Sequence, residues 1–376
     1  MEKVMSRKLI TISTIMTLMS TSVIADVPNV AADIAPIHSL VSRVMDGVGA
    51  PKLIVQSGAS PHGYRLRPSE AKALQDADHV FWMGEELTPW LDSAIGTLAS
   101  KASVTTLLDQ QGVILHDFRE GALFEAHDHS AHGDDDHDDH DDHDDHDDHK
   151  DHDDHDDHKD HDDHDDHDDH DDHDDHKDHD DHDDHDDHDD HKDHDDHDDH
   201  DDHDDHGSHD PHAWLSPENA KLWLNIIASK LSVSDPENAA TYFMNAAAGQ
   251  AEIEAMIAEV KATLKPVQGG KFVVFHDAYQ YFENDFDFYA SGAISLGDSS
   301  DPSPARIEKV QKRIRDEGIQ CVLAEPQFKK GLVATVMEGS DATASVIDPL
   351  GAELETGPKL YTRLIKNMAK TLRNCL

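Results

Sequence analysis

The chain has 376 residues, and 82 acidic against 31 basic side chains give it a formal net charge of −51. Most of this charge is local, because the 83 residues from His127 to His209 hold 28 of the 34 histidines and carry −42. The rest has an ordinary composition and is long enough for two domains, which excludes a disulfide-stapled miniprotein, a coiled coil and a wholly disordered chain. The negative sign also excludes a basic nucleic-acid binder.

Residues 1–25 have the pattern of a secretion signal. Three basic residues precede an apolar run that begins at Leu9, and residues 23–25 offer a cleavage site before Asp26. An uncleaved membrane anchor is the alternative, but the run is short and rich in Ser and Thr. No later stretch is apolar enough to span a bilayer. We therefore expect a cleaved signal and an exported protein.

Short apolar runs alternate with helical patterns from Val27 to Leu108. The expected elements are an apolar run at 53–56, a helix at 69–77, a strand at 79–84, a helix at 87–99 and a strand at 103–108. Strands that alternate with helices of this length predict βαβ units and a mostly parallel sheet. This part of the chain therefore predicts one α/β lobe.

The tract from Asp134 to His206 repeats Asp-Asp-His, and Lys replaces Asp at four positions. It holds no apolar residue, so it cannot bury surface to offset its ordering entropy, and we expect it to be disordered. A plain solvated linker is the simpler interpretation, but a linker needs no imidazole at every third residue. Imidazole and carboxylate together bind zinc, copper and nickel, so we expect weak, exchangeable metal sites here.

A long helix follows the tract. A first helix is expected from Pro217 to about Leu231, and a pattern rich in Ala, Glu and Met then runs to about Lys265, interrupted only by Gly249. The second helix would span about 45 Å. Alternation then resumes with strands at 271–276, 288–294, 321–326 and 344–347 and helices from 277, at 303–317, 329–339 and 359–372.

The predicted fold class is α/β, with two lobes built on parallel-type sheets and joined by one long rigid helix. The expected boundaries are an N-terminal lobe at 26–235, a linking helix at 236–265 and a C-terminal lobe at 266–376. The first lobe would contain the histidine-rich insertion at 127–209. Cys321 and Cys375 are the only two cysteines, and an even pair in an exported chain predicts a disulfide.

Six histidines lie outside the tract, and three of them occupy informative positions. His62 lies in the loop after the apolar run at 53–56, His212 precedes a capped helix, and His276 ends an apolar strand. Asp348 also ends an apolar strand. Ligands of open α/β sheets bind outside the carboxyl ends of strands, so these four side chains can converge between the lobes. Three imidazoles with a carboxylate or water form a tetrahedral zinc set. The remaining histidines fit structural roles: His38, His79 and His116.

Five stretches carry a family resemblance: GASPHGYRLRPSEA, DPHAWLSPENA, VVFHDAYQYFE, CVLAEPQF and VIDPLGAE. They resemble the periplasmic zinc-specific solute-binding proteins of ABC importers, the ZnuA group of the cluster that also serves manganese. The resemblance implies a zinc ion held by His62, His212 and His276, with Asp348 or water as the fourth ligand. Some relatives use a Glu beside the first histidine, but Pro61 occupies that position. Manganese-type relatives have Glu in place of His276, so three imidazoles favour zinc.

The resemblance also implies a function. The protein would be a monomer that captures Zn²⁺ in the periplasm as its cargo and delivers it to an inner-membrane ABC permease with a cytoplasmic ATPase. A zinc hydrolase is one alternative, because three histidines and water also form a catalytic set, but the chain has no HExxH motif and we expect no enzymatic activity. A periplasmic zinc buffer, in which the folded part only carries the tract, is the other alternative.

Overall fold

The computed structural model describes residues 27–119, 124, 209–295, 302–327 and 330–376. The expectations for the signal at 1–25 and for the tract at 134–206 fall outside these residues. Within the described residues, no helix is both long and apolar enough to cross a membrane.

The first lobe contains a parallel four-stranded sheet with the strand order β2-β1-β3-β4. Its elements in chain order are β1 (Val30–Ala32), α1 (Ala35–Val44), β2 (Lys52–Leu53), α2 (Pro68–Gln75), β3 (His79–Trp82), α3 (Pro89–Leu98) and β4 (Ser103–Thr106). Helices α1, α2 and α3 all have Pro in the first turn, where a missing N–H leaves no intrahelical bond unmade. The central strands β1 and β3 are buried along their whole length, which is why they read as apolar runs.

The second lobe contains another parallel four-stranded sheet, with the strand order β6-β5-β7-β8. Its elements are β5 (Phe272–His276), α6 (Gln280–Phe286), β6 (Ala293–Ser295), α7 (Pro304–Glu317), β7 (Cys321–Ala324), α8 (Lys330–Met337) and β8 (Thr343–Val346). In both lobes the first and third strands are central and the second and fourth lie at the edges. The predicted fold class, two α/β lobes with parallel sheets, is confirmed.

One element differs clearly from its expected position. The strand expected at 288–294 forms only as β6, which begins at Ala293. The preceding residues instead terminate α6, because Asp287 adopts a left-handed conformation and the Phe288 N–H donates to the Glu283 carbonyl. The first residues of the segment predicted as a strand therefore form the cap of α6 instead.

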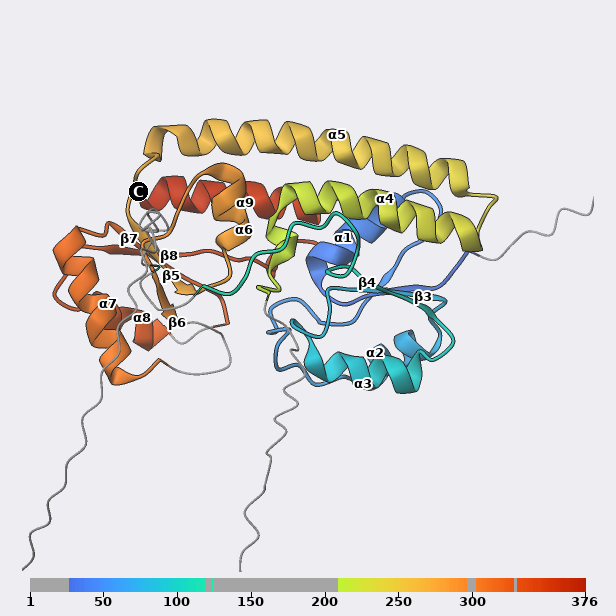
Figure 1. Ribbon diagram of the computed structural model, residues 1–376, viewed down its shortest axis with the longest axis horizontal. Helices are drawn as coiled ribbons and strands as arrows, with labels where there is room; N and C mark the ends of the chain where they lie inside the picture. The colour runs from blue at the N-terminus through green and yellow to red at the C-terminus, as the bar shows by residue number, and fades with distance from the viewer. Residues whose placement is uncertain (1–26, 120–123, 125–208, 296–301, 328–329) are drawn as a thin grey trace, which may run out of the picture. The chain divides into compact units, whose positions relative to one another are not determined.

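Helix α5 (Ala239–Leu264) packs against both α4 (Pro217–Ser234) and α9 (Leu360–Cys375), and Figure 1 shows it running along the two of them. A short 3₁₀ turn, η2 (Ala213–Leu215), precedes α4, and another, η3 (Lys265–Val267), follows α5. Helix α5 contacts α1 of the first lobe as well as α9, which in turn contacts β8 of the second lobe. A Cβ atom at Gly249 would lie 2.9 Å from Leu224 and 3.1 Å from Arg43. Gly249, which interrupts the helical pattern, therefore allows the close approach of α5 to its neighbours.

A disulfide joins Cys321 at the start of β7 to Cys375 at the end of α9. This confirms the expected pairing. The bond fixes the last helix to a central strand of the second lobe, so the chain end is tied to the core that carries part of the candidate site.

Candidate metal centre

His62 lies in the loop between β2 and α2 and is half-buried. The loop is held from the α3 side, because the Trp90 indole N–H donates to the Pro61 carbonyl over 2.7 Å. Near the start of α2, the Tyr64 hydroxyl donates to Glu70 over 2.7 Å. These two contacts place the His62 backbone, although its side chain keeps more exposure than the other two candidate imidazoles.

His212 precedes η2 and is 5% exposed. Its orientation is set by Asp210, whose Oδ1 lies 2.9 Å from the His212 backbone nitrogen and 2.6 Å from its Nδ1. One carboxylate oxygen therefore fixes both the turn and the ring. With Nδ1–H donating to Asp210, the neutral imidazole presents Nε2 as an acceptor.

His276 is the last residue of β5 and is 3% exposed. Its Nδ1 lies 2.5 Å from Oε1 of Glu325, which follows the neighbouring strand β7. The second oxygen of this buried carboxylate accepts from the Gln327 side chain over 2.7 Å. His276 thus has the same arrangement as His212, with a carboxylate at Nδ1 and Nε2 turned away from it.

The two Nε2 atoms of His212 and His276 lie 3.3 Å apart. When both Nδ1–H groups donate to carboxylates, neither Nε2 carries a proton, so two acceptors face one another. Two nitrogen ligands of a tetrahedral ion with metal–nitrogen distances of about 2.0–2.1 Å lie about 3.3–3.4 Å apart. The pair therefore already has the separation that one shared cation requires.

His62 completes a row of three rings, since its ring centroid lies 5.5 Å from that of His212, which lies 5.2 Å from that of His276. The cavity that these three rings line has a volume of about 10 Å³, which is about the space one water molecule needs. Its other lining residues are Pro61, Trp214, Glu325, Gln327, Pro349 and Leu350. In the described part of the chain, no three His, Cys, Asp or Glu side chains yet form a complete ligand set.

Asp348 does not line this cavity. Its carboxylate accepts from three backbone N–H groups, those of Leu350, Gly351 and Ala352, over 3.0, 2.8 and 2.5 Å. Burial raises the pKa of Asp348, and these backbone donors oppose that rise. In this structure the carboxylate therefore stabilises the loop after β8. The Trp214 indole donates to the Pro349 carbonyl over 2.8 Å, which holds that loop against η2.

A cluster of three charged side chains, Arg119, Asp277 and Glu283, lies next to the imidazoles, because Asp277 directly follows His276. Arg119 donates to both oxygens of Asp277 over 3.0 Å and to Glu283 over 2.6 Å, and its guanidinium lies 3.6 Å from the centre of the Phe124 ring. Burial raises the pKa of Asp277 and of Glu283, and Arg119 opposes both shifts. The buried carboxylates around the site make it attractive to a cation, and Arg119 offsets part of their charge.

The other described histidines have structural contacts. The Nε2 of His38 lies 3.2 Å from the Pro51 carbonyl oxygen, that of His79 lies 2.5 Å from the Ser234 hydroxyl, and that of His116 lies 3.2 Å from the Asn284 amide nitrogen. Burial lowers the pKa of both His38 and His79. None of the three lines the imidazole cavity.

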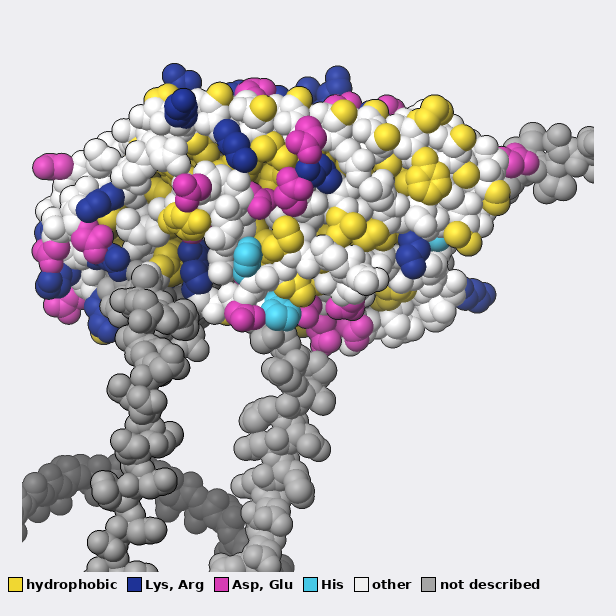
Figure 2. Space-filling view, turned by 45° about the horizontal axis from the view of Figure 1, so that its top comes forward, with side chains coloured by type: hydrophobic (Ala, Val, Ile, Leu, Met, Phe, Trp, Pro, Cys, Tyr) yellow, Lys and Arg dark blue, Asp and Glu magenta, His cyan; other side chains and the backbone are white. Residues whose placement is uncertain are grey.

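Two residues of the site, Asp210 and Glu325, were not singled out in the sequence. A signal for Asp210 exists, because an Asp two residues before a candidate ligand can bond that residue's backbone. Glu325 also follows a predicted strand, but its neighbour in space depends on strand order. Figure 2 shows a few histidine side chains at the surface of one face, whereas His212 and His276 are buried.

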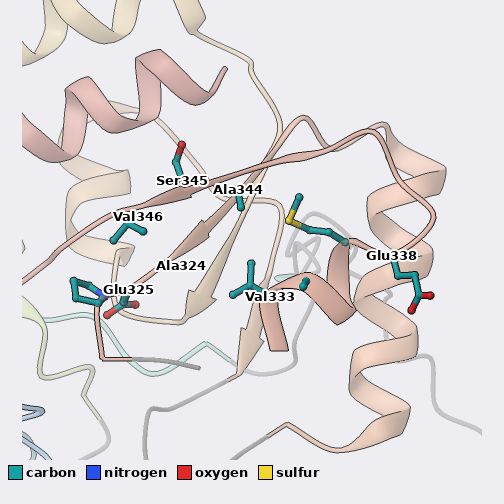
Figure 3. Close-up of a pocket in the computed structure, with 10 residues that line it drawn as sticks. Ala324, Glu325, Val333, Glu338, Ala344, Ser345 and Val346 are labelled. Carbon is teal, nitrogen blue, oxygen red and sulfur yellow. The ribbon is translucent and has the colours of Figure 1, made fainter. Parts of the chain in front are cut away.

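A separate, larger cavity of about 550 Å³ lies in the second lobe and shares Glu325 with the imidazole site. It is lined mainly by apolar side chains of β7, α8 and β8. Figure 3 shows Glu325 and Glu338 on opposite sides of it, with Val333 between them. Glu325 thus borders both the apolar cavity and the smaller one between the imidazoles.

Two α/β lobes that hold one imidazole at a strand end and another before a 3₁₀ turn, each backed by a carboxylate, define a protein that binds a small cation. The sequence matches the family described as "Zinc-uptake complex component A periplasmic" over residues 30–375. A "High-affinity zinc uptake system protein ZnuA" of Brucella abortus (strain 2308) is 45% identical over 347 residues, 92% of this chain and 91% of that protein. The protein of the same name from Paracoccus denitrificans (strain Pd 1222) is 41% identical over 353 residues, 94% and 93% of the two chains.

The fold is also found among solved structures. A "Crystal structure of ZnuA" superposes with a TM-score of 0.62 at 18% identity, covering 93% of this chain and 99% of that one. The chain belongs to the ZnuA family, the periplasmic component A of zinc-uptake complexes.

Proposed function

We propose that the protein captures Zn²⁺ in the periplasm and delivers it to an inner-membrane ABC permease that a cytoplasmic ATPase drives. The ligands in this proposal are His62, His212 and His276. The observation that carries it is the 3.3 Å separation of the His212 and His276 Nε2 atoms, each ring having its Nδ1 beside a carboxylate. Family membership supports zinc as the cargo.

The carboxylates would act by orienting the ligands. Asp210 and Glu325 fix the tautomers of His212 and His276 and make their Nε2 lone pairs more basic, as carboxylates behind zinc-bound histidines do. An imidazole set also favours zinc over manganese, which prefers oxygen ligands. The ion-sized cavity suits a bare cation and has no room for an organic substrate, which argues for binding without catalysis.

His62 would close the site last and open it first. It is the most exposed of the three imidazoles and lies on a loop, whereas His212 and His276 are buried. Completing the set requires a movement of the His62 ring toward the other two, and the reverse movement would free the ion for the permease. The three backbone N–H bonds to Asp348 favour water over this carboxylate as the fourth ligand.

The remaining parts of the proposal concern the rest of the chain. Residues 1–25 would be removed on export, and the protein would act as a monomer with lobes at 26–235 and 266–376 joined by the helix at 236–265. The histidine-rich insertion would bind further ions more weakly, because its imidazoles and carboxylates have no fixed geometry. Its negative charge would raise the cation concentration near the site.

A chelator-competition titration tests the site. Zinc affinity is measured for the wild-type protein and for His62→Ala, His212→Ala and His276→Ala, read by tryptophan fluorescence, to which the Asp, His and Lys residues of the tract contribute nothing. His116→Ala is the matched control, because His116 is hydrogen-bonded but lies outside the cavity. All three site variants should lose affinity while the control keeps it. Wild-type affinity in all three would disprove the ligand assignment.

A further inference from the structure

Tyr281 belongs to α6, the helix that follows His276, and its side chain is 1% exposed. Its hydroxyl contacts the two chain segments that flank the histidine-rich insertion. The hydroxyl oxygen accepts from the His116 backbone N–H over 3.1 Å, and the O–H donates to the Asp210 carbonyl over 2.7 Å. The Asp210 N–H in turn donates to the His116 carbonyl over 2.7 Å. One buried hydroxyl of the second lobe therefore holds both segments.

The carbonyl that accepts from Tyr281 belongs to the residue that orients His212. The Oδ1 atom of Asp210 lies 2.9 Å from the His212 backbone nitrogen and 2.6 Å from its Nδ1. Because hydrogen bonds hold the Asp210 backbone at both its N–H and its carbonyl, the carboxylate starts from a fixed position. A continuous series of contacts thus runs from the second lobe through Tyr281 and Asp210 to the His212 ring.

This series joins the two proposed ligands that come from different lobes. The 3.3 Å separation between the Nε2 atoms of His212 and His276 depends on how the lobes meet. Tyr281 shares a lobe with His276, yet it holds the residue that orients His212. A displacement of about 1 Å between the lobes would stretch the Tyr281 bond beyond hydrogen-bonding distance. The orientation of His212 is therefore sensitive to small lobe movements.

Tyr361 of α9 provides a comparison on the same segment. It is also buried, and its hydroxyl lies 3.0 Å from the Trp214 carbonyl oxygen and 3.2 Å from that of Ser216. Both carbonyls follow His212 in the chain, but neither residue has a carboxylate with which to orient an imidazole. Tyr361 and Tyr281 therefore both hold this segment, and only the bond of Tyr281 leads to the residue that orients a ligand ring.

We propose that Tyr281 is a positioning residue that makes the orientation of His212 depend on contact between the lobes. This inference rests on the proposed function. While the lobes are in contact, the Tyr281 hydroxyl fixes Asp210, and Asp210 keeps the His212 Nε2 directed at the ion. When the permease moves the lobes apart, the bond to the Asp210 carbonyl breaks, and the hold of His212 on the ion weakens.

The test compares Tyr281→Phe and Tyr361→Phe with the wild-type protein in the full-length chain. Zn²⁺ affinity is measured by chelator competition, and the dissociation rate by stopped-flow mixing with excess chelator. Tryptophan fluorescence reads both, because Trp214 lines the imidazole cavity. Tyr281→Phe should bind zinc about tenfold more weakly, mainly through faster dissociation. Tyr361→Phe should stay within about twofold of the wild-type affinity.

Thermal unfolding without metal controls for stability. Both variants lose a buried hydrogen bond and should unfold at a lower temperature, so a general loss of stability would weaken zinc binding in both. Equal losses of affinity in the two variants would overturn the proposal. Wild-type affinity and dissociation rate in Tyr281→Phe would overturn it as well.

A double-mutant cycle with Asp210→Ala shows whether the tyrosine acts through the carboxylate. This substitution keeps the backbone carbonyl that Tyr281 contacts and removes the group that orients His212. In the Asp210→Ala background, Tyr281→Phe should change the affinity by less than about twofold. An undiminished effect there would refute the proposed role. His276→Ala separates these failures from failure of the site itself, because wild-type affinity in that variant would instead refute the proposed function.

Discussion

The two lobes have the same strand order but use the ends of their central strands differently. In the first lobe, the fully buried Asp33 follows β1 and accepts from the backbone N–H groups of Ile34 and Met83, each over 2.7 Å. Met83 follows β3, so this carboxylate joins the ends of the first and third strands. In the second lobe, His276 and Glu325 join the ends of β5 and β7 in the equivalent place.

The two arrangements differ in whether a polar side-chain atom remains available for a ligand. Backbone donors occupy both oxygens of Asp33, and burial raises its pKa to about 7. The second-lobe pair uses one ring nitrogen for the carboxylate and turns the other toward the cavity. Equivalent positions in one topology thus join two strand ends in one lobe and also present a ring nitrogen to a cavity in the other, and the side chain determines which.

Breaking the second-lobe pair should have the largest effect. His276→Ala removes one of the three proposed ligands, and loss of a ligand costs more than the 10–100-fold typical of outer-shell changes, so zinc affinity should fall by more than about 1,000-fold, or about 4 kcal/mol. Asp33→Asn should leave the affinity within about twofold, since Asp33 lies outside the cavity. Competition titrations of both variants check this, and comparable losses would contradict the contrast between the lobes.

Removing the disulfide should weaken the second lobe, which alone carries this cross-link. The bond closes a separation of 54 residues, for which the chain-entropy relation gives about 4 kcal/mol. Urea unfolding of the Cys321→Ser/Cys375→Ser variant, without metal, should show a loss of this size. A loss below about 1 kcal/mol would mean that the bond constrains the unfolded chain far less than the relation assumes.

Asp33 should make stability depend on pH. Its folded pKa of about 7 lies above the ordinary value of 3.8, so between these values the folded protein keeps a proton that the unfolded chain has lost. Stability should therefore fall as the pH rises, by about 2 kcal/mol between about pH 5.5 and 7 from this residue. Asp33→Asn should lack this part of the slope in urea unfolding of the metal-free protein. Identical slopes would refute the shift.

The smallest effect is expected from deleting residues 134–206. The deletion removes no apolar residue, so zinc affinity at the imidazole site should change by less than about twofold while several weaker equivalents disappear. Calorimetric stoichiometry of the two proteins measures both. Unchanged stoichiometry would make the tract a solvated linker, and loss of the tight site would show that folding needs it.

The sequence predicted the two lobes, and it predicted that the three imidazoles come together. Both predictions depend on local patterns. Apolar strands that end in His276 or lead to His62 can be recognised without the third dimension. Glu325 could not be assigned, because its contact with His276 arises from the adjacency of β5 and β7. That adjacency follows from the strand order, which the local patterns of a single sequence do not reveal.

Asp348 illustrates the opposite case. Its strand-end position predicted a side chain directed toward a ligand, yet its carboxylate accepts from the backbone of the next turn. The sequence Asp-Pro-Leu-Gly carries a signal for this alternative, because Asp before such a turn bonds the N–H groups that follow. A strand-end rule gives the location of a residue, whereas local competition for its oxygens determines its orientation.

Asp117 and His209 are 92 residues apart, yet they form an antiparallel bridge, and their side chains lie 2.9 Å apart. The two chain segments that flank the histidine-rich insertion are therefore held side by side by this bridge. Loop closure becomes more costly only with the logarithm of length, about 0.6 kcal/mol for each doubling. If the tract is the flexible loop that its sequence predicts, gaining or losing Asp-Asp-His triplets should require no compensating substitutions in the folded lobes.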